Sequence, residues 1–165
     1  MMKSGRDIGR TRGASLMPPL LFALLLLLSL SAVAGASCGE GQALQIQIGA
    51  QTFEALRADS PAKRERGLSG RRQLAAQTGM WFEFETPGWH GFWMQDMNFP
   101  IDLIWVAPSR QVLGAITLQP CVAAAPCRIH LPPGLVSQVL EINAGEFSGK
   151  PGDSVTWRCA PTAQK

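Results

Sequence analysis

The chain has 165 residues, of which 46% are hydrophobic, and its 15 Lys and Arg against 12 Asp and Glu give a formal net charge of +3. This length suits one domain with its own hydrophobic core. Four of the basic residues and one acid precede the first apolar run, so the remainder has 11 of each and no net charge. That balance argues against a nucleic-acid binder, which needs a basic face to neutralise phosphates.

The first 36 residues have the three parts of a cleavable signal peptide. Basic residues come first, a mostly leucine run follows over residues 20–30, and small residues in an A-x-A pattern end at Ala34 or Ala36. The apolar run is shorter than the roughly 20 residues that cross a bilayer. We therefore expect cleavage on export, no remaining membrane span, and a single β-rich domain over residues 37–165 in the periplasm or outside the cell.

Four cysteines follow the signal peptide. An even count in an exported chain indicates disulfides, and four cysteines allow three pairings. We favour Cys121–Cys127, which closes a short loop, with Cys38–Cys159, which joins the two ends of the domain. The spacing of Cys121 and Cys127 is too long for a typical zinc pair. Small residues before Cys38 leave lipoprotein anchoring open, although the leucine usual three positions earlier is missing.

The remaining sequence predicts many short strands and one helix. Alternation of apolar and polar residues, or bounding by Pro- and Gly-rich turns, indicates strands at residues 43–49, 51–58, 79–84, 90–94, 101–106, 111–118, 136–142 and 154–159. Ser60 and Pro61 are typical of a helix start, and this helix should end near Gly67. We expect an all-β domain with one short helix, an antiparallel sandwich or barrel of jelly-roll type.

The most distinctive stretch is Gly91–Val106, G-F-W-M-Q-D-M-N-F-P-I-D-L-I-W-V. It resembles the F-W-M-K-N-T-x-x-P-L-D motif of the bacterial and archaeal family known as domain of unknown function 192. Further matches follow the family's order, with R-G-L at 66–68, G-M-x-F at 79–82, L-E-x-N-A-G at 140–145 and P-G-D at 151–153. The resemblance covers about residues 53–157 and implies a β-domain that is often exported and has no assigned activity.

The chain departs from this family pattern at four positions. Gln95, Asp96 and Met97 stand where the family has Lys, Asn and Thr, and Ser69 stands where R-G-L is usually followed by Met. A role that depends on the side chains of that trio therefore does not carry over to this chain.

Six residues are candidates for a ligand site, because they combine aromatic surface beside a Pro-Gly turn with polar groups that need partners. They are Trp89, His90, Trp93, Asp102, Glu141 and Arg66. Asp102 enters an apolar strand, so its carboxylate should find a cation or cap turn amides; the candidate partners are Arg57, Arg66, Arg71 and Asn143. Glu141 should face the side opposite Leu140 and Ile142.

We expect a non-enzymatic periplasmic module that binds a ligand or partner, such as a cell-wall glycan or peptide, as a monomer without a cofactor. Whether the chain is an enzyme stays open. An exported hydrolase could pair Asp102 with Glu141 or Asp96, as carboxylates pair in glycosidases.

A copper protein is a further alternative. His90, Met94 and Met97 are residue types that bind copper in oxidising compartments, although an extended strand would send the two methionines to opposite faces. One basic cluster predicts a solvated helix face, or otherwise a surface for anionic lipid or glycan; it comprises Lys63, Arg64, Arg66, Arg71 and Arg72.

Overall fold

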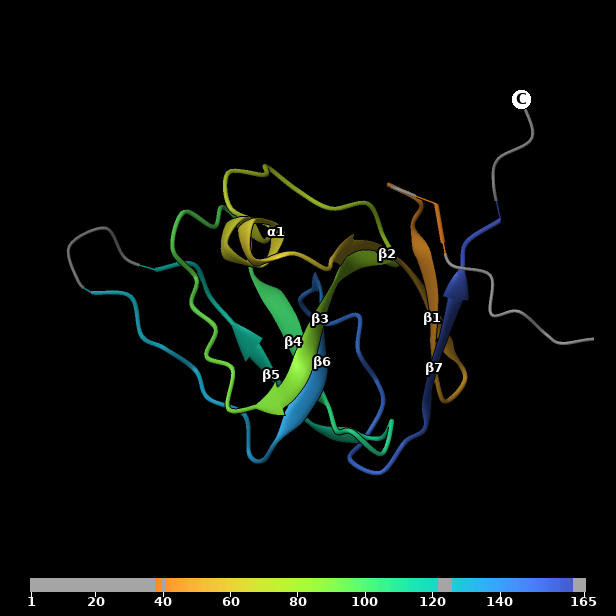
Figure 1. Cartoon of the computed structure of the whole chain (residues 1–165). Helices are drawn as coiled ribbons and strands as arrows, with labels where there is room; N and C mark the ends of the chain where they lie inside the picture. The colour runs from red at the N-terminus through yellow and green to blue at the C-terminus, as the bar shows by residue number, and fades with distance from the viewer. Residues whose placement is uncertain (1–37, 40, 122–125, 162–165) are drawn as a thin grey trace, which may run out of the picture. The chain divides into compact units, whose positions relative to one another are not determined.

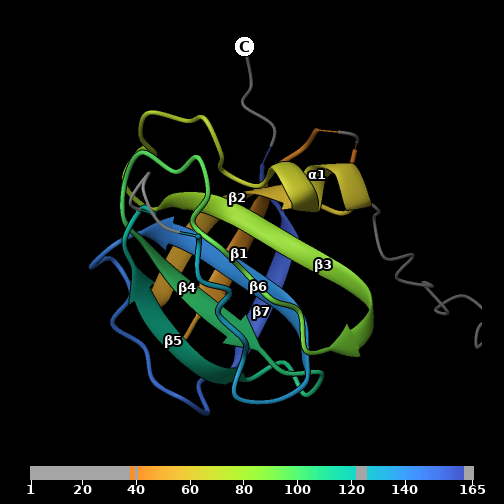
Figure 2. The same cartoon turned by 90° about the vertical axis from the view of Figure 1, so that its left-hand side faces the viewer.

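The computed structural model describes residues 38–39, 41–121 and 126–161, which belong to one of the chain's two units, Ser37–Lys165. The expected signal peptide lies outside these residues. The elements, in chain order, are β1 (Leu44–Ile48), β2 (Gln51–Ala58), α1 (Pro61–Arg66), β3 (Thr78–Gly88), β4 (Ile101–Val106), β5 (Val112–Leu118), β6 (Val136–Asn143) and β7 (Val155–Cys159). Figures 1 and 2 show their arrangement from two sides.

The seven strands form one mixed sheet in the order β5-β4-β6-β3-β2-β1-β7. β2 and β3 are parallel, whereas all the other neighbours are antiparallel. The β-rich class and the single helix are therefore confirmed, but the described residues form an open sheet and not the expected sandwich or barrel. Its edge strands β5 and β7 approach each other at a bridge between Gln111 and Ser154, with backbone hydrogen bonds on either side of it.

The parallel pair explains why the antiparallel prediction was incomplete. Parallel neighbours need a long connection that carries the chain back to the same end of the sheet. Residues 59–77, which include α1, make that connection between β2 and β3. A six-residue helix gives a weak sequence signal for a crossover, so the direction of β3 was not evident from its own residues.

The strand predicted at residues 90–94 is not formed. Only Phe92 pairs there, through two backbone hydrogen bonds with His130. A turn follows at once, because the amide of Met97 donates to the carbonyl of Met94 and Asp96 has a left-handed φ of 56°. The segment is therefore a loop that covers the sheet and is not an eighth strand.

Each face of the sheet has its own hydrophobic cluster. The first contains alternate residues of the strands, including Phe53, Trp81 and Leu140. The rings of Trp81 and Trp157 lie 5.1 Å apart although β3 and β7 are not adjacent in the sheet, so the sheet bends around this cluster. The second cluster, which includes Phe82, lies on the opposite face beneath the loop after β3.

Two disulfides are present, Cys38–Cys159 and Cys121–Cys127, in the pairing favoured from the sequence. Disulfides indicate an oxidising compartment outside the cytoplasm. The sulfur of Cys38 is bonded to Cys159, so it is not available for the thioether of a lipoprotein anchor. Among the described residues, no helix is long and apolar enough to cross a membrane.

Candidate ligand-binding site

A cavity of about 200 Å³ lies on the second face of the sheet. Its walls come from the C-terminal half of α1 with the R-G-L turn, from β3, and from the loop after β3; Glu141 is the residue that β6 contributes. Alternation along the strands explains this composition, because side chains two residues apart share a face. Phe82 and Phe84 therefore point to the same side, and Glu141 joins them because it pairs with Met80 of β3.

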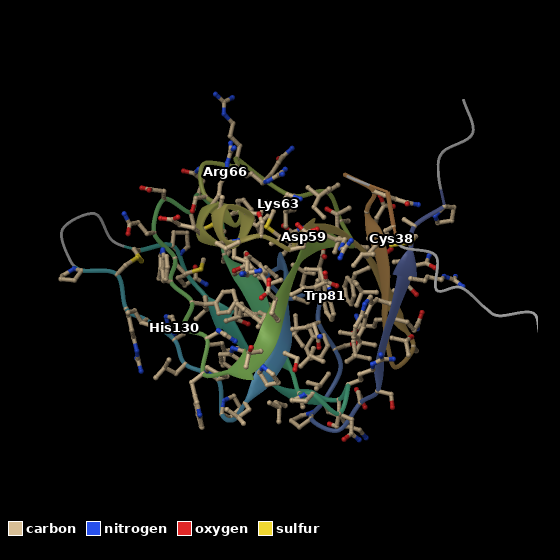
Figure 3. All side chains as sticks on the ribbon, in the orientation of Figure 1. Cys38, Asp59, Lys63, Arg66, Trp81 and His130 are labelled. Carbon is tan, nitrogen blue, oxygen red and sulfur yellow. A yellow bond between two sulfur atoms is a disulfide. The ribbon has the colours of Figure 1, made fainter. Side chains whose placement is uncertain are left out.

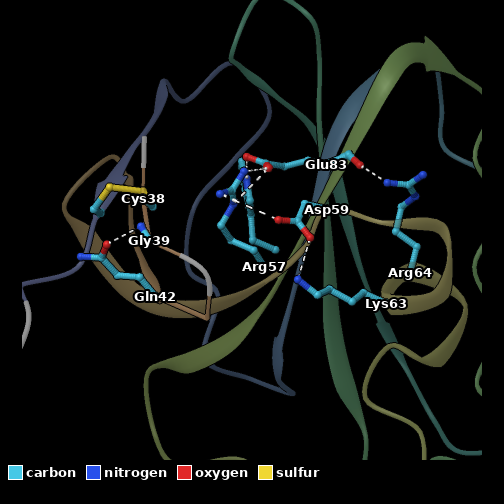
Figure 4. Close-up of polar contacts among 10 residues, drawn as sticks. Cys38, Gly39, Gln42, Arg57, Asp59, Lys63, Arg64 and Glu83 are labelled. Carbon is cyan, nitrogen blue, oxygen red and sulfur yellow. Dashed lines mark hydrogen bonds and ion pairs between the residues drawn. A yellow bond between two sulfur atoms is a disulfide. The ribbon is translucent and has the colours of Figure 1, made fainter. Parts of the chain in front are cut away.

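Ionic and polar contacts hold α1 beside β2 and β3 (Figure 4). Arg57 Nη2 lies 2.6 Å from Glu83 Oε2, which links β2 to β3. Lys63 Nζ lies 2.9 Å from Asp59 Oδ1, and Arg64 Nη1 donates to the carbonyl of Glu83 at 2.8 Å. These contacts fix the helix that forms one wall of the cavity.

The ends of this helix have clear local causes. The side chain of Ser60 accepts a hydrogen bond from the amide of Lys63, and Pro61 occupies the first turn, as predicted. At the other end Gly67 adopts a φ of 49°, which favours glycine. The R-G part of the R-G-L motif thus ends α1 and turns the chain toward Leu68, whose side chain is buried.

Contacts to backbone carbonyls join the R-G-L turn to the F-W-M loop. Ser69 Oγ donates to the carbonyl of Gln95 at 3.1 Å, and the amide of Gly70 donates to the carbonyl of Asp96 at 2.9 Å. The acceptors are backbone carbonyls, which every residue has. The two contacts are therefore compatible with Gln95 and Asp96 in place of the family's Lys and Asn. Asn and Asp both tolerate the left-handed conformation found at Asp96.

Aromatic rings form the wall opposite α1. The ring of His90 stacks on Phe84 with centroids 3.6 Å apart, and Phe92 meets Phe82 edge to face at 5.1 Å. His90 Nε2 lies 3.1 Å from the carbonyl of Thr86. A Cβ at Gly88 would lie only 2.9 Å from the His90 ring, so glycine there allows the stacked arrangement.

Glu141 is the unusual group in the cavity. Glu141 is only 6% exposed. Among the described residues, its carboxyl group has no hydrogen-bond or ion-pair partner, and it lines the cavity. Burial raises the pKa of Glu141 to about 8, since a low-dielectric surrounding disfavours the charged form. The carboxyl group is therefore mostly protonated at neutral pH. Buried polar groups nearly always have partners, so an unpartnered one facing a cavity marks a candidate binding point.

Four of the six candidate ligand residues meet at this cavity: Arg66, His90, Trp93 and Glu141. Trp93 is 44% exposed, and Arg66 is an exposed residue at the end of α1 (Figure 3). The structure does not bring the other two into the site. Trp89 is 59% exposed and is not part of the cavity lining, and Asp102 lies on the other face of the sheet.

Asp102 has a structural role instead. Because it pairs with Ile142 while its neighbour Leu103 pairs with Glu141, its side chain and that of Glu141 point to opposite faces. Its carboxylate accepts hydrogen bonds from Thr117 Oγ1 at 2.6 Å and from the amides of Gly145 and Phe147 at 2.8 and 3.1 Å. The expected cap of turn amides is thus present.

The cations considered as partners of Asp102 lie elsewhere. Arg57 pairs with Glu83, and Arg66 and Arg71 are exposed. Asn143 Nδ2 instead donates to the carbonyls of Leu74 and Ala75. The sequence predicted that the Asp102 carboxylate needs a partner, and the amides of the turn after β6 are those partners.

The geometry does not support the two alternative sites. Asp102 and Glu141 are separated by the sheet, and Asp96 is an exposed residue of the loop that covers the face opposite Asp102. A carboxylate pair around Asp102 is therefore not formed. His90 and Met97 line the cavity, but Met94 is 2% exposed within the second cluster and is not part of the lining.

Sequence reasoning missed several members of the site. Phe84 and Arg64 were not among the candidates, although Arg64 lies over the Phe84 ring at 5.4 Å from its centroid. Period-two alternation from Met80 through Phe82 would have placed Phe84 on the face of Glu141. Nothing in the sequence marks Arg64 apart from its neighbours in the basic cluster.

These features define a small β-domain with an aromatic cavity on one face of an open sheet. The chain belongs to the DUF192 family, described as an uncharacterized ACR, whose model matches residues 44–157. The resemblance found in the motifs is thereby confirmed.

Two crystal structures are similar to the chain. A protein of unknown function from Novosphingobium aromaticivorans DSM 12444 shares 28% identity with a TM-score of 0.59, over 70% of this chain and 84% of that one. A "putative transcription regulator" from Sinorhizobium meliloti 1021 shares 25% identity with a TM-score of 0.59, over 70% of this chain and 92% of that one. No protein with a curated description matches the chain.

Proposed function

We propose that this protein is an exported, non-enzymatic binding module whose ligand enters the cavity between α1, β3 and the loop after β3. The observation that carries the proposal is the buried, unpartnered carboxyl group of Glu141 facing that cavity. Burial without a partner costs stability, and a ligand that completes the hydrogen bonding of Glu141 would offset this cost.

The character of the lining supports binding. Ligand sites are usually concave and mostly apolar, with a few polar groups that fix orientation. Phe84, Phe92 and Trp93 supply the apolar part, and Glu141 supplies the polar point. The volume of about 200 Å³ is below the roughly 300–1,000 Å³ typical of drug-sized ligands. It therefore suits one side chain or one sugar unit of a longer cell-wall peptide or glycan.

Binding without catalysis is favoured by the surroundings of Glu141. Hydrolysis of the two-carboxylate kind needs a second carboxyl group placed across the substrate from the first. Within the described parts of the chain, no histidine, lysine or second carboxylate is hydrogen-bonded to Glu141. Two disulfides agree with action in the periplasm or outside the cell.

The test is a binding screen with two matched tryptophan variants. The oxidised, exported protein is titrated by calorimetry with a panel of cell-wall glycans and peptides. Trp93→Ala, which removes a ring of the lining, should lower the affinity for the best ligand by roughly tenfold or more. Trp89→Ala removes an exposed ring outside the lining and should change the affinity little.

Thermal melting of both variants checks that they fold. Failure of the whole panel to bind, or equal losses in both variants, would contradict a ligand site in this cavity.

A further inference from the structure

We infer that the group entering the cavity is the ammonium end of a lysine-type side chain of a peptide, with Glu141 as its counter-ion. This inference rests on the proposed binding function and names the ligand chemistry of the same site. It starts from Glu141, which faces the cavity without a partner, and from the aromatic rings around it.

Among the described residues, no charged group forms an ion pair or a hydrogen bond with Glu141. Its cross-strand neighbours on β3 and β4 are Met80 and Leu103, which are apolar. The charged and titratable groups that face the cavity come from α1 and the loop after β3; they are Arg64, Glu65, Arg66 and His90.

Each of these four groups is engaged elsewhere or exposed. Arg64 donates to the carbonyl of Glu83, and His90 Nε2 lies against the carbonyl of Thr86. Glu65 and Arg66 are exposed residues at the end of α1. A ligand group that enters the cavity can therefore supply the partner that Glu141 lacks among the described residues.

A cation fits this position better than a neutral group. Hydrogen bonds between an ammonium group and a carboxylate are among the strongest in proteins. Aromatic rings attract cations over their faces, and aromatic cages bind ammonium groups in this way. Phe92 and Trp93 line the cavity together with Glu141, so aromatic rings and a buried acid share one lining.

A flexible alkyl chain fits better than a sugar ring. A lysine side chain can lay its methylene groups along apolar walls while its ammonium end reaches a polar partner. A sugar carries hydroxyl groups on every side, and each needs a hydrogen-bond partner when it is buried. The phenylalanine rings of the lining offer no hydrogen-bond partner, so sugar hydroxyl groups that face Phe82, Phe84 and Phe92 would remain unsatisfied.

This pairing has a pH signature. Free Glu141 has a raised pKa of about 8 and must lose its proton to become the counter-ion of an ammonium group. Affinity should then fall as the pH drops from 8 to 6, because an increasing share of the protein holds the proton. A neutral acceptor such as a carbonyl would bind the protonated carboxyl group and show the opposite trend.

The experiment compares two probes that differ in one charge. Nα-acetyl-lysinamide and its Nε-acetylated form are titrated into the oxidised full domain at pH 6 and pH 8. We expect the charged probe to bind at least about tenfold more tightly at pH 8 than the acetylated one. Its affinity should fall by up to about fiftyfold at pH 6, because a pKa of about 8 leaves roughly half of Glu141 ionised at pH 8 and about 1% at pH 6.

Variants assign the effect to Glu141. Glu141→Gln should lose both the preference for charge and the pH dependence, while the rest of the lining is unchanged. Glu85→Gln changes an exposed carboxylate on the same strand as Phe84, outside the lining, and should keep both properties. Thermal melting confirms that each variant folds.

Three other results would overturn the inference. Equal or tighter binding of the acetylated probe, or tighter binding at pH 6, shows a neutral ligand group and leaves the proposed function intact. Binding of glucosamine or N-acetylglucosamine without binding of the lysine probe shows a glycan ligand and also leaves it intact. Failure of both probes, together with failure of the glycan and peptide panel, removes the proposed function as well.

Discussion

Glu141 shows how a single residue can be poorly suited to folding and well suited to binding. It lies between Leu140 and Ile142, both fully buried on the other face of β6. A leucine at position 141 would satisfy the second cluster without desolvating a carboxyl group. The acid therefore reduces stability at a place where it faces a cavity, and this combination makes it a functional-site candidate.

The burial of Glu141 makes stability depend on pH in a defined direction. Its pKa is about 8 in the folded protein, against an ordinary value of 4.5. Below pH 4.5 the group is protonated in both states and carries no penalty. Between pH 4.5 and 8 the unfolded chain ionises first, so the free energy of unfolding should fall, by up to several kcal/mol, and level off above pH 8.

Urea unfolding of the wild type and Glu141→Gln between pH 5 and pH 9 measures this contribution. The variant should gain stability relative to the wild type as the pH rises to 8, and the gain should then stay constant. Glu85→Gln, at an exposed position on β3, should show no such trend. A difference between wild type and Glu141→Gln that does not change with pH would disprove the buried, protonated state.

At the scale of elements, Asp102 joins β4 to β5 and to the turn that follows β6. It accepts from Thr117 on β5 and from the amides of Gly145 and Phe147. Asp102→Ala should lower the free energy of unfolding by about 3 kcal/mol, because three partly buried hydrogen bonds to a carboxylate are lost. Thr117→Val removes one of these hydrogen bonds and should cost about 1 kcal/mol.

The same variants test the separation of the two faces. The side chain of Asp102 lies on the face opposite the cavity, so Asp102→Ala should keep the ligand affinity of the wild type below its melting temperature. Calorimetry well below the melting temperature of the variant measures this affinity. A selective loss of affinity in Asp102→Ala, with Thr117→Val unaffected, would instead give Asp102 a place in binding.

The elements that the sequence predicted well are those with strong local causes. Leu44, Ile46 and Ile48 alternate with polar residues, and β1 follows that pattern. Ser60 and Pro61 begin α1 as expected from helix capping. The alternation around Glu141 also predicted the face to which its side chain points.

What the sequence did not predict depends on contacts between distant segments. The parallel pairing of β2 with β3 follows from the path of residues 59–77. Two walls of the cavity come together where the turn after α1 binds the loop after β3, in part through Ser69 and Gly70. Neither contact has a local pattern, since the acceptors are backbone carbonyls that every residue possesses.

At the scale of the molecule, the two disulfides should differ in their effect on stability. Cys38 and Cys159 are 121 residues apart, whereas Cys121 and Cys127 are 6 apart. In the chain-entropy model a cross-link stabilises a protein by restricting the unfolded chain, and more so for a longer loop. This model gives about 5 kcal/mol for the long loop and about 2 kcal/mol for the short one.

Replacing each pair by alanine tests this difference, with chemical denaturation and thermal melting as the measurements. The Cys38→Ala/Cys159→Ala protein should lose the larger part of its stability, although the hydrogen-bonded ladder between β1 and β7 still joins the same ends of the domain. The Cys121→Ala/Cys127→Ala protein should melt closer to the wild type and keep the cavity, whose lining includes neither cysteine. Equal destabilisation of the two variants would contradict the chain-entropy account and would show that the Cys121–Cys127 bond stabilises the folded state directly. A large loss in the first variant would make the domain depend on an oxidising compartment, because reduction breaks the same bond.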